Sequence, residues 1–403
     1  MSLAAEPISP LLRTASRSVQ RAVSELRRGD LVMLQGGDGR ALLLRAAEMA
    51  DAPALALVRQ AAAQGGGGEP ALVVTDKRAI AAGLLAQAVE PAQADPMGAG
   101  TVVIAPAPGP SNKGPSSQGT SGQGLTPDLV RLLADPTRPG HATLDITPIV
   151  RPFPSAEGEA LLLVKLARLL PAVVVAEVPA ARAAEVAARN DLLTVRGADV
   201  QAYQAAGEST LRQVVEASVP LLDAEDTRLI AFRAPDGGVE HLAILIGNPD
   251  PAQPVLARLH SECFTGDLLG SLRCDCGAQL RGAIREIAAQ GSGVVLYLAQ
   301  EGRNIGLMNK LRAYRLQDAG VDTVDANLMV GFEADERTYL PAATMLKALG
   351  FHAVRLMTNN PDKLSQLARW GVQVVDRVPH IFPANGHNIA YLRTKAEKAG
   401  HLL

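Results

Sequence analysis

Short apolar runs alternate with segments of helical period along the first half of the chain. Four runs have the length of buried strands, namely Leu31–Leu34, Ala71–Val74, Thr101–Ile104 and Ala172–Val178. Between them lie segments rich in Ala, Leu and Arg. This alternation is typical of a sheet covered by helices. The first half is therefore predicted to have an α/β or α+β fold.

The second half has a different pattern. Leu229–Arg233 and His241–Ile246 are predicted strands, and a Pro-Asp-Gly-Gly turn joins them as a hairpin. Apolar residues at i, i+4 and i+7 from Leu280 predict a helix that ends near Gly291. Val294–Leu298 follows as a buried strand. Strands and helices again share one segment of chain.

Length and composition fit two domains. The 403 residues are 47% hydrophobic and 20% charged, which is enough apolar material for two cores. We place the domains at residues 1–208 and 209–403. Their fold class is α+β or α/β, each domain being a mixed sheet with helices. The Gly- and Ser-rich stretch 109–124 is expected to be a mobile loop, because such residues do not offset the entropy of ordering.

Charge and hydropathy exclude several classes of protein. The net charge of −2 argues against binding to a nucleic acid backbone. No apolar run reaches 18 residues, so no membrane span is expected. The N-terminal residues show no apolar core followed by a cleavage site, so a cytoplasmic location is expected.

The three cysteines all lie within fourteen residues, at Cys263, Cys274 and Cys276. On an extended segment Cys274 and Cys276 would point to the same face. Three thiolates bind Zn²⁺ and leave a fourth position for water, as in a catalytic site. A structural zinc with His260 as fourth ligand and unmetallated thiols are the alternatives. The odd number of cysteines disfavours a disulfide.

A nucleotide would have to be held by side chains. The chain contains no G-x-x-x-x-G-K-[ST] motif, and no G-x-G-x-x-G motif follows a strand. Lysine and arginine suit phosphate oxygens, although each one taken alone could be a solvated surface charge. The candidates are Arg258, Arg303, Lys310, Arg312, Arg337 and Lys363. Glu301 follows an apolar strand, a place where a carboxylate often faces a cleft.

Taken together, these residues resemble a known family. The segment from Val255 to Leu403 is similar to GTP cyclohydrolase II, and its fold is expected to be that family's. The matching motifs are Arg258–Cys263, Ser271–Gly277, Gln300–Leu307, Asn309–Lys310, Ala313–Tyr314, Asp322–Val324, Gly331–Phe332, Asp335–Arg337, Thr358–Pro361 and Thr394–Lys398. The resemblance implies a hydrolase that converts GTP to 2,5-diamino-6-(5-phosphoribosylamino)pyrimidin-4(3H)-one, formate and pyrophosphate, the first step of riboflavin biosynthesis.

The resemblance also implies roles for single residues. Cys263, Cys274 and Cys276 would hold one Zn²⁺ per subunit, and Mg²⁺ would accompany the triphosphate. Tyr314 would assist ring opening, while Asp335 would accept a proton and Arg337 would attack the α-phosphate. Because arginine is a poor nucleophile, a clamp on the phosphate is the alternative for Arg337. The residues implied to contact GTP are Arg258, Leu259, His260, Ser261, Glu262, Gln279, Glu301, Gly302, Arg303, Thr323, Thr358 and Lys363.

Residues 19–208 resemble a degenerate 3,4-dihydroxy-2-butanone 4-phosphate synthase. The matches are Ala22–Gly29, Arg45–Glu48 and Arg138–His141. The acidic run that this synthase family uses to hold Mg²⁺ is replaced by Gln35–Leu44, which contains a single carboxylate. The family's Gly-His-Thr-Glu-Ala element appears as Glu157–Ala160, without its histidine. Because Mg²⁺ needs several oxygen ligands, we predict no synthase activity.

Three other functions stay open at this point. The protein could be a zinc protein that binds GTP as a regulator without turnover. It could be a bifunctional enzyme that also makes 3,4-dihydroxy-2-butanone 4-phosphate, or a cyclohydrolase paralogue with a different product. In each case the expected partner is GTP, with no nucleic acid or membrane, and the resemblance implies a homodimer.

Overall fold

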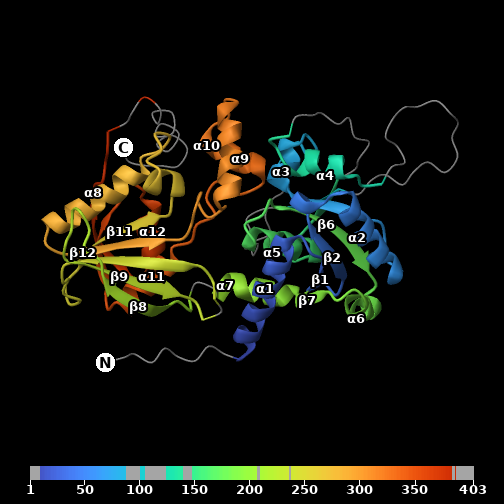
Figure 1. Ribbon diagram of the computed structural model, residues 1–403, viewed down its shortest axis with the longest axis horizontal. Coiled ribbons are helices and arrows are strands. Elements are labelled where there is room, and N and C mark those ends of the chain that lie inside the picture. Colours follow the sequence, from blue (N-terminus) through green and yellow to red (C-terminus); the bar gives the residue numbers. More distant parts are fainter. Residues whose placement is uncertain are drawn as a thin grey trace.

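The computed structural model describes residues 10–87, 100–104, 124–138, 148–206, 209–235, 237–383 and 386. Within these ranges the strands form two seven-stranded sheets, which Figure 1 shows in separate halves of the molecule. The expected loop at 109–123, most of the Arg138–His141 motif and the Thr394–Lys398 motif lie outside the described residues.

The first sheet has the order β5-β4-β3-β6-β2-β1-β7. Its pairs are antiparallel except for β1 with β7, which run parallel. Its strands are β1 (Val32–Gln35), β2 (Ala41–Ala46), β3 (Ala71–Thr75), β4 (Thr101–Ile104), β5 (Ile149–Arg151), β6 (Ala172–Val178) and β7 (Leu193–Arg196). The helices of this half are α1 (Pro10–Arg28), α2 (Ala52–Gln64), α3 (Asp76–Ala81), α4 (Pro127–Ala134), α5 (Ala156–Leu166), α6 (Ala180–Arg189) and α7 (Gly197–Ala206).

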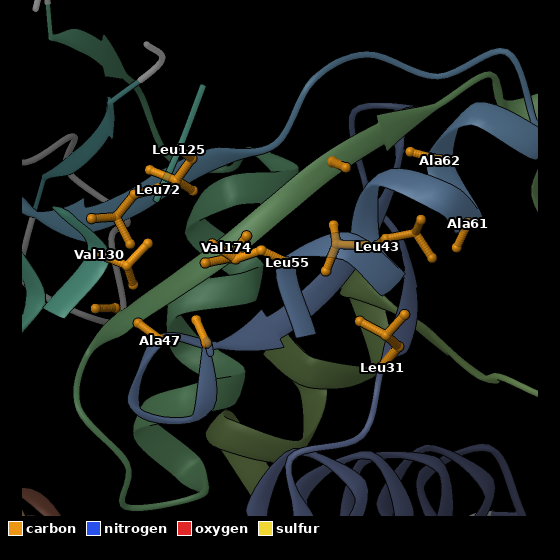
Figure 2. Packing of buried hydrophobic residues seen from close by; sticks show 14 of the residues in the cluster. Leu31, Leu43, Ala47, Leu55, Ala61, Ala62, Leu72, Leu125, Val130 and Val174 are labelled. Carbon is orange, nitrogen blue, oxygen red and sulfur yellow. The ribbon is translucent and has the colours of Figure 1, made fainter. Parts of the chain in front are cut away.

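The strands β1, β2, β3, β4 and β6 are mostly apolar because both faces of the sheet are buried there, whereas the edge strands β5 and β7 are more exposed. Along β2, Ala41 and Leu43 belong to one core cluster, whereas Leu42 and Leu44 belong to the other. Figure 2 shows the first of these clusters, where Leu55 of α2 lies beside Leu43 and Val174. Helices α1, α5 and α7 cover the opposite face. The four strands predicted in this half are confirmed.

The second sheet has the order β14-β13-β11-β12-β10-β9-β8, parallel from β14 to β12 and antiparallel beyond. Its strands are β8 (Arg212–Ser218), β9 (Thr227–Arg233), β10 (Glu240–Ile246), β11 (Val255–Ser261), β12 (Gly293–Leu298), β13 (Ala353–Met357) and β14 (Gln373–Val378). The helices are α8 (Cys276–Ala289), α9 (Leu307–Asp318), α10 (Thr323–Val330), α11 (Leu340–Ala348) and α12 (Asp362–Arg369). The predicted hairpin, helix and strand of this half are confirmed, and so is the class of two mixed sheets with helices.

Helices α9 and α10 lie between the two halves of the molecule (Figure 1). A small cluster of buried side chains joins Leu170, which precedes β6, to Ile305, Ala313, Ala326 and Phe332 of the second half. The junction therefore has an apolar core of its own. In the part of the chain that the structure describes, no helix combines the length and apolar character needed to cross a bilayer.

Candidate active site

The functional residues gather at the carboxyl ends of three adjacent strands. Strands β11, β12 and β13 are parallel, with β11 in the middle. Their carboxyl ends therefore meet at one edge of the sheet, where α/β proteins bind ligands. Cys263 follows β11, Glu301 follows β12 and Thr358 follows β13. The predicted position of Glu301 at a cleft is confirmed, and its side chain is buried there.

The three cysteines converge as predicted, but not on an extended segment. Cys274 lies in a loop and Cys276 is the first residue of α8, so a turn brings the two thiols together. All three sulfur atoms lie within 4.8 Å of one another. Among the described residues, they are the one group of three or more metal-ligating side chains whose ligand atoms converge. The cluster is compatible with a metal site.

His260 is not part of this cluster. Its Nε2 lies 3.0 Å from the carboxylate of Asp267, and its ring stacks on Tyr297. Burial lowers the pKa of His260, which favours a neutral ring that donates its Nε2 proton to Asp267. Asp267 also accepts the backbone N–H of Cys263 at 3.0 Å. His260 and Asp267 thus fix the backbone that presents the first thiol.

Close packing around the sulfur atoms explains a glycine in the loop. A Cβ at Gly266 would lie 2.8 Å from Cys274 Sγ, closer than real Cβ atoms come to a neighbour, and 3.0 Å from Cys263 Sγ. On the other side, Lys310 Nζ lies 3.1 Å from Cys263 Sγ and 2.7 Å from Glu301 Oε1. The second carboxylate oxygen of Glu301 accepts the N–H of Phe264.

The pKa values of the three thiols shift in different directions. Hydrogen bonds from Cys274 and Cys276, together with the nearby Lys310 ammonium, lower the pKa of the Cys263 thiol. The hydrogen bond to Cys263 raises the pKa of Cys274 to about 11. The contacts with both other cysteines raise the pKa of Cys276 as well. One thiolate forms readily, whereas a second and a third need a further positive charge.

All the residues implied to contact GTP line one cleft beside the thiols. Tyr314 and Arg337 line the same cleft, and Asp335 pairs with Arg337 at its margin. The twelve are Arg258, Leu259, His260, Ser261, Glu262, Gln279, Glu301, Gly302, Arg303, Thr323, Thr358 and Lys363. The structure thus brings together residues that are up to 105 positions apart in the chain, from Arg258 to Lys363.

The cleft is lined by more cations than carboxylates. Six lysine or arginine residues line it, namely Arg258, Arg273, Arg303, Lys310, Arg337 and Lys363, against the three acids Glu262, Asp275 and Glu301. Burial lowers the pKa of Arg258 to about 10. Among the described residues, no partner contacts the buried Nε of Arg258. Such an excess of positive charge suits a polyanionic ligand.

The prediction of Arg312 as a phosphate ligand is wrong. Its guanidinium pairs with Glu48 of the first half and approaches Asp135 at 3.7 Å. It is therefore a contact between the two halves and does not line the cleft. The helix α9 carries both Lys310 and Arg312, and the two side chains leave it in different directions.

Asp335 and Arg337 form a bidentate pair. Arg337 Nε donates to Asp335 Oδ1 at 2.8 Å, and Nη2 donates to the other carboxylate oxygen. Arg337 Nη1 also lies 3.4 Å from Ser261 Oγ. Tyr314 also lines the cleft, with the Arg273 guanidinium 4.9 Å from its ring centre, and burial raises the pKa of its hydroxyl.

Sequence reasoning missed three residues that build the thiol site. Gly266 leaves space for the sulfur atoms, Asp267 holds the backbone of Cys263, and Lys310 contacts that thiol directly. The sequence predicts Lys310 only as a phosphate ligand. The sequence did contain a signal for two of them, because Gly266, a small residue, and Asp267, a hydrogen-bond acceptor, lie between Cys263 and Cys274.

The first half contains a second cluster of polar residues. It joins the two stretches of the synthase resemblance, because Asp38 and Arg40 of the β1–β2 turn meet Glu157 and Glu159 of α5. Arg40 donates to Glu157 Oε1 at 2.8 Å and to Asp38 Oδ2 at 2.9 Å. The N–H of Gly37 donates to Glu159 Oε2 at 3.0 Å. Asp38 and Glu157 thus share a cation that belongs to the same chain, Arg40.

Comparison with known proteins identifies the class of this molecule. Residues 212–379 match the family model described as GTP cyclohydrolase II. The GTP cyclohydrolase-2 of Azospirillum brasilense is 53% identical over 401 residues, which covers 98% of this chain and 97% of that protein. The GTP cyclohydrolase-2 of Proteus mirabilis is 51% identical over 193 residues, 48% of this chain and 96% of that protein.

The chain belongs to the GTP cyclohydrolase II family. The predicted family and the prediction of a hydrolase are confirmed. A solved structure of a two-domain 3,4-dihydroxy-2-butanone 4-phosphate synthase from A. baumannii was also found, with a TM-score of 0.33 and 16% sequence identity over 89% of this chain and 99% of that one.

Proposed function

We propose that this protein hydrolyses GTP to 2,5-diamino-6-(5-phosphoribosylamino)pyrimidin-4(3H)-one, formate and pyrophosphate, the first step of riboflavin biosynthesis. The observation that carries the proposal is one cleft with three converging thiols at one side and six cations around it. The names of the relatives from A. brasilense and P. mirabilis support it. We place the activity in residues 209–403 and in the cytoplasm, with a homodimer as the functional unit.

The thiol cluster fits a zinc ion. Tetrahedral zinc with bonds of about 2.3 Å holds its sulfur ligands about 3.8 Å apart. The sulfur atoms of Cys263 and Cys274 lie 3.8 Å apart. We assign Cys263, Cys274 and Cys276 as the ligands of one ion per subunit. When bound there, zinc supplies a water activated for attack near neutral pH, which removal of C8 of guanine as formate requires.

The chain's own residues hold and orient the nucleotide. Arg258, Arg303 and Lys363 are proposed to bind the triphosphate together with Mg²⁺. Glu301 is proposed to read the guanine ring, since a carboxylate oxygen can accept more than one hydrogen bond. Tyr314 is proposed to donate a proton as the ring opens, because its raised pKa keeps the hydroxyl protonated.

Asp335 and Arg337 are proposed to act at the α-phosphate, from which pyrophosphate leaves. The hydrogen bond from Arg337 Nε to Asp335 gives the carboxylate a direct path to accept a proton from the guanidinium. With that proton removed, Arg337 can attack phosphorus. If the proton stays, the same pair clamps the developing phosphate charge. Single-turnover quenching followed by peptide mass spectrometry distinguishes the two, because attack leaves a guanylyl adduct on Arg337 and clamping leaves none.

The first domain is proposed to lack synthase activity. Asp38 and Glu157 both pair with Arg40, so they are not available as a set of oxygen ligands for Mg²⁺. Incubation of the purified protein with ribulose 5-phosphate and Mg²⁺ should yield no butanone phosphate and no formate. Product formation in that assay would show a bifunctional enzyme instead.

Product mass spectrometry after incubation with GTP, Zn²⁺ and Mg²⁺ tests the main proposal. We expect stoichiometric formate and pyrophosphate together with the diaminopyrimidinone. GTP binding without any product would support the regulatory zinc protein, and a different pyrimidine or pterin product would support the paralogue.

A further inference from the structure

The end of α5 in the first domain contacts the loop of the second domain that carries Asp335 and Arg337. Lys165 of α5 is only 7% exposed, and its Nζ lies 2.7 Å from the carboxylate of Glu336. Glu336 stands between Asp335 and Arg337 in the chain. The ion pair therefore fixes the loop that carries both of the residues proposed to act on the α-phosphate.

Arg168, three residues further along, holds a second loop of the cleft, residues 299–306. Its Nη2 donates to the carbonyl oxygen of Ala299 at 2.7 Å and lies 3.5 Å from Asn304 Oδ1. Its side chain also packs over Gly306, where an added Cβ would lie 3.2 Å from Arg168 Cβ. In return, Asn309 of α9 donates to the carbonyl oxygen of Arg168. Residues 299–306 include Glu301 and Arg303 of the cleft.

This second loop has a backbone that needs external support. Arg303 and Asn304 have φ values of +63° and +75°, and Gly302 and Gly306 are left-handed as well. Non-glycine residues in this region persist only where the surrounding structure enforces the conformation. The contacts of Arg168 to Ala299, Asn304 and Gly306 enclose the segment on the side of the first domain.

The two loops form one unit. Arg303 Nη1 donates to the carbonyl oxygen of Ala334 at 2.8 Å, and the N–H of Glu336 donates to the carbonyl oxygen of Arg303. Displacement of one loop therefore displaces the other. Lys165 lies in the last turn of α5 and Arg168 lies just past its end, and both contact this pair of loops from the first domain.

We propose that Lys165 and Arg168 of the first domain are positioning residues for the hydrolytic site. They act through Glu336, Ala299 and Asn304, and they hold Arg303 and Arg337 in the geometry in which both face the substrate phosphates. The first domain thereby serves the reaction of the second without a reaction of its own. This inference rests on the proposed function.

A matched control for Lys165 and Arg168 is a contact that joins the two domains without touching the catalytic loops. Arg312 pairs with Glu48 across the same boundary, with side chains 21% and 16% exposed. Arg312 does not line the cleft, and its guanidinium contacts Asn309, Glu48 and Asp135. Loss of this pair should weaken the junction without moving the catalytic loops.

The experiment compares Lys165→Met, Arg168→Met and Arg312→Met in the full chain. We expect kcat for formate release to fall about 10- to 100-fold in the first two, because small misplacements of reacting groups have effects of that size. In Arg312→Met we expect kcat within about twofold of the unchanged protein. Lys165→Arg should retain activity. The double variant Lys165→Glu with Glu336→Lys should recover activity that each single reversal loses.

Equal kcat values in Lys165→Met, Arg168→Met and Arg312→Met would overturn the proposal, because the contacts would then only join the domains. Hydrogen exchange provides a readout that is independent of turnover. Peptides covering 299–306 and 333–337 should exchange faster in Lys165→Met and Arg168→Met, and at the unchanged rate in Arg312→Met. If the unchanged protein releases no formate, the proposed function fails, whereas the exchange data still decide whether these residues position the loops. Unchanged exchange at both loops would exclude that role.

Discussion

The two domains treat their buried polar groups in opposite ways. In the first domain, Arg40 pairs with both Asp38 and Glu157, and Arg151 approaches Glu157 at 3.7 Å, so these acids have cationic partners within the chain. The remaining buried acid, Glu159, accepts hydrogen bonds from Gly37 and Gln201. Burial raises the pKa of Glu159, which disfavours its charge further. These carboxylates already have partners within the chain, so they are less available to a ligand.

In the second domain the charges are not balanced. Three thiols lie within 4.8 Å of one another, and the cleft beside them has six cations and three carboxylates in its lining. Bringing like charges together costs free energy that a bound metal ion or a polyanion would offset. The comparison indicates where to look for function, because an uncompensated cluster needs a ligand and a compensated one does not.

The largest expected effect is on the thiol cluster. Cys274→Ser removes one of three ligands, so we expect the metal content to fall below one ion per chain. Formate release should fall by more than about 100-fold, the upper range for changes to groups that only support a metal ligand. Elemental analysis and a formate assay measure the two effects, and circular dichroism checks that the fold is retained.

A Cys274→Ser protein that keeps both its metal and its turnover would place the ion elsewhere. Cys263→Ser and Cys276→Ser are the parallel variants, and all three should behave alike if the ion is shared. A variant that keeps its metal but loses turnover would assign that cysteine a role outside ligation.

Arg40→Met tests the opposite property of the first domain. It leaves Glu157, only 5% exposed, without its nearest cation, so we expect unfolding free energy to fall by about 2 kcal/mol. Because Arg40 lies outside the catalytic cleft, formate release per folded molecule should stay within about twofold. Urea unfolding and the formate assay measure these effects.

The double variant Arg40→Met with Glu157→Gln is the control for charge. It removes the charge of Glu157, one of the two carboxylates that lose Arg40, and should recover part of the lost stability. A loss of turnover as large as that of Cys274→Ser would contradict the separation of the two regions, since it would make the polar pocket part of the reaction.

Much of this contrast could be predicted from the sequence. Apolar runs located β3, β4, β6 and β12, because strands in sheets buried on both faces are continuous apolar segments. Clustering of the cysteines located the thiol site, and a family resemblance located the residues of the cleft. The single carboxylate in Gln35–Leu44, Asp38, predicts a first domain without a magnesium site.

Other features could not be predicted because they depend on contacts between distant segments. The turn that brings Cys274 and Cys276 together at the start of α8 has no periodic signature. Lys165, Arg168 and Arg312 look like ordinary surface cations until the packing of one domain on the other shows what they touch. Charged side chains at a boundary follow the arrangement of domains, which local patterns do not encode.

The last expected effect appears only on acidification and concerns two buried histidines of the second domain. Burial and the nearby Arg168 lower the pKa of His241 to about 4, and burial with Arg258 does the same for His380. His241 accepts the N–H of Ala299 at 3.0 Å through Nδ1, so protonation would also remove this hydrogen bond. The first domain has no histidine among its described residues, so this sensitivity to acid belongs to the second domain.

The sign of the effect follows from the lowered pKa. In the unfolded chain a histidine takes up a proton below about pH 6.5, whereas in the folded protein His241 and His380 do so only near pH 4. Their contribution to stability is therefore complete above pH 6.5 and is lost as the pH falls toward 4. Each histidine should reduce the unfolding free energy by about 2 kcal/mol between pH 8 and pH 5.

Urea unfolding across this range measures the loss, and His241→Asn, whose side-chain oxygen can accept the same N–H, should remove about 2 kcal/mol of it. His352→Asn, on the surface, is the matched control and should leave the pH dependence unchanged. If His241→Asn and the unchanged protein lose equal stability, His241 takes up its proton as readily in the folded protein as in the unfolded chain, and its burial carries no such cost.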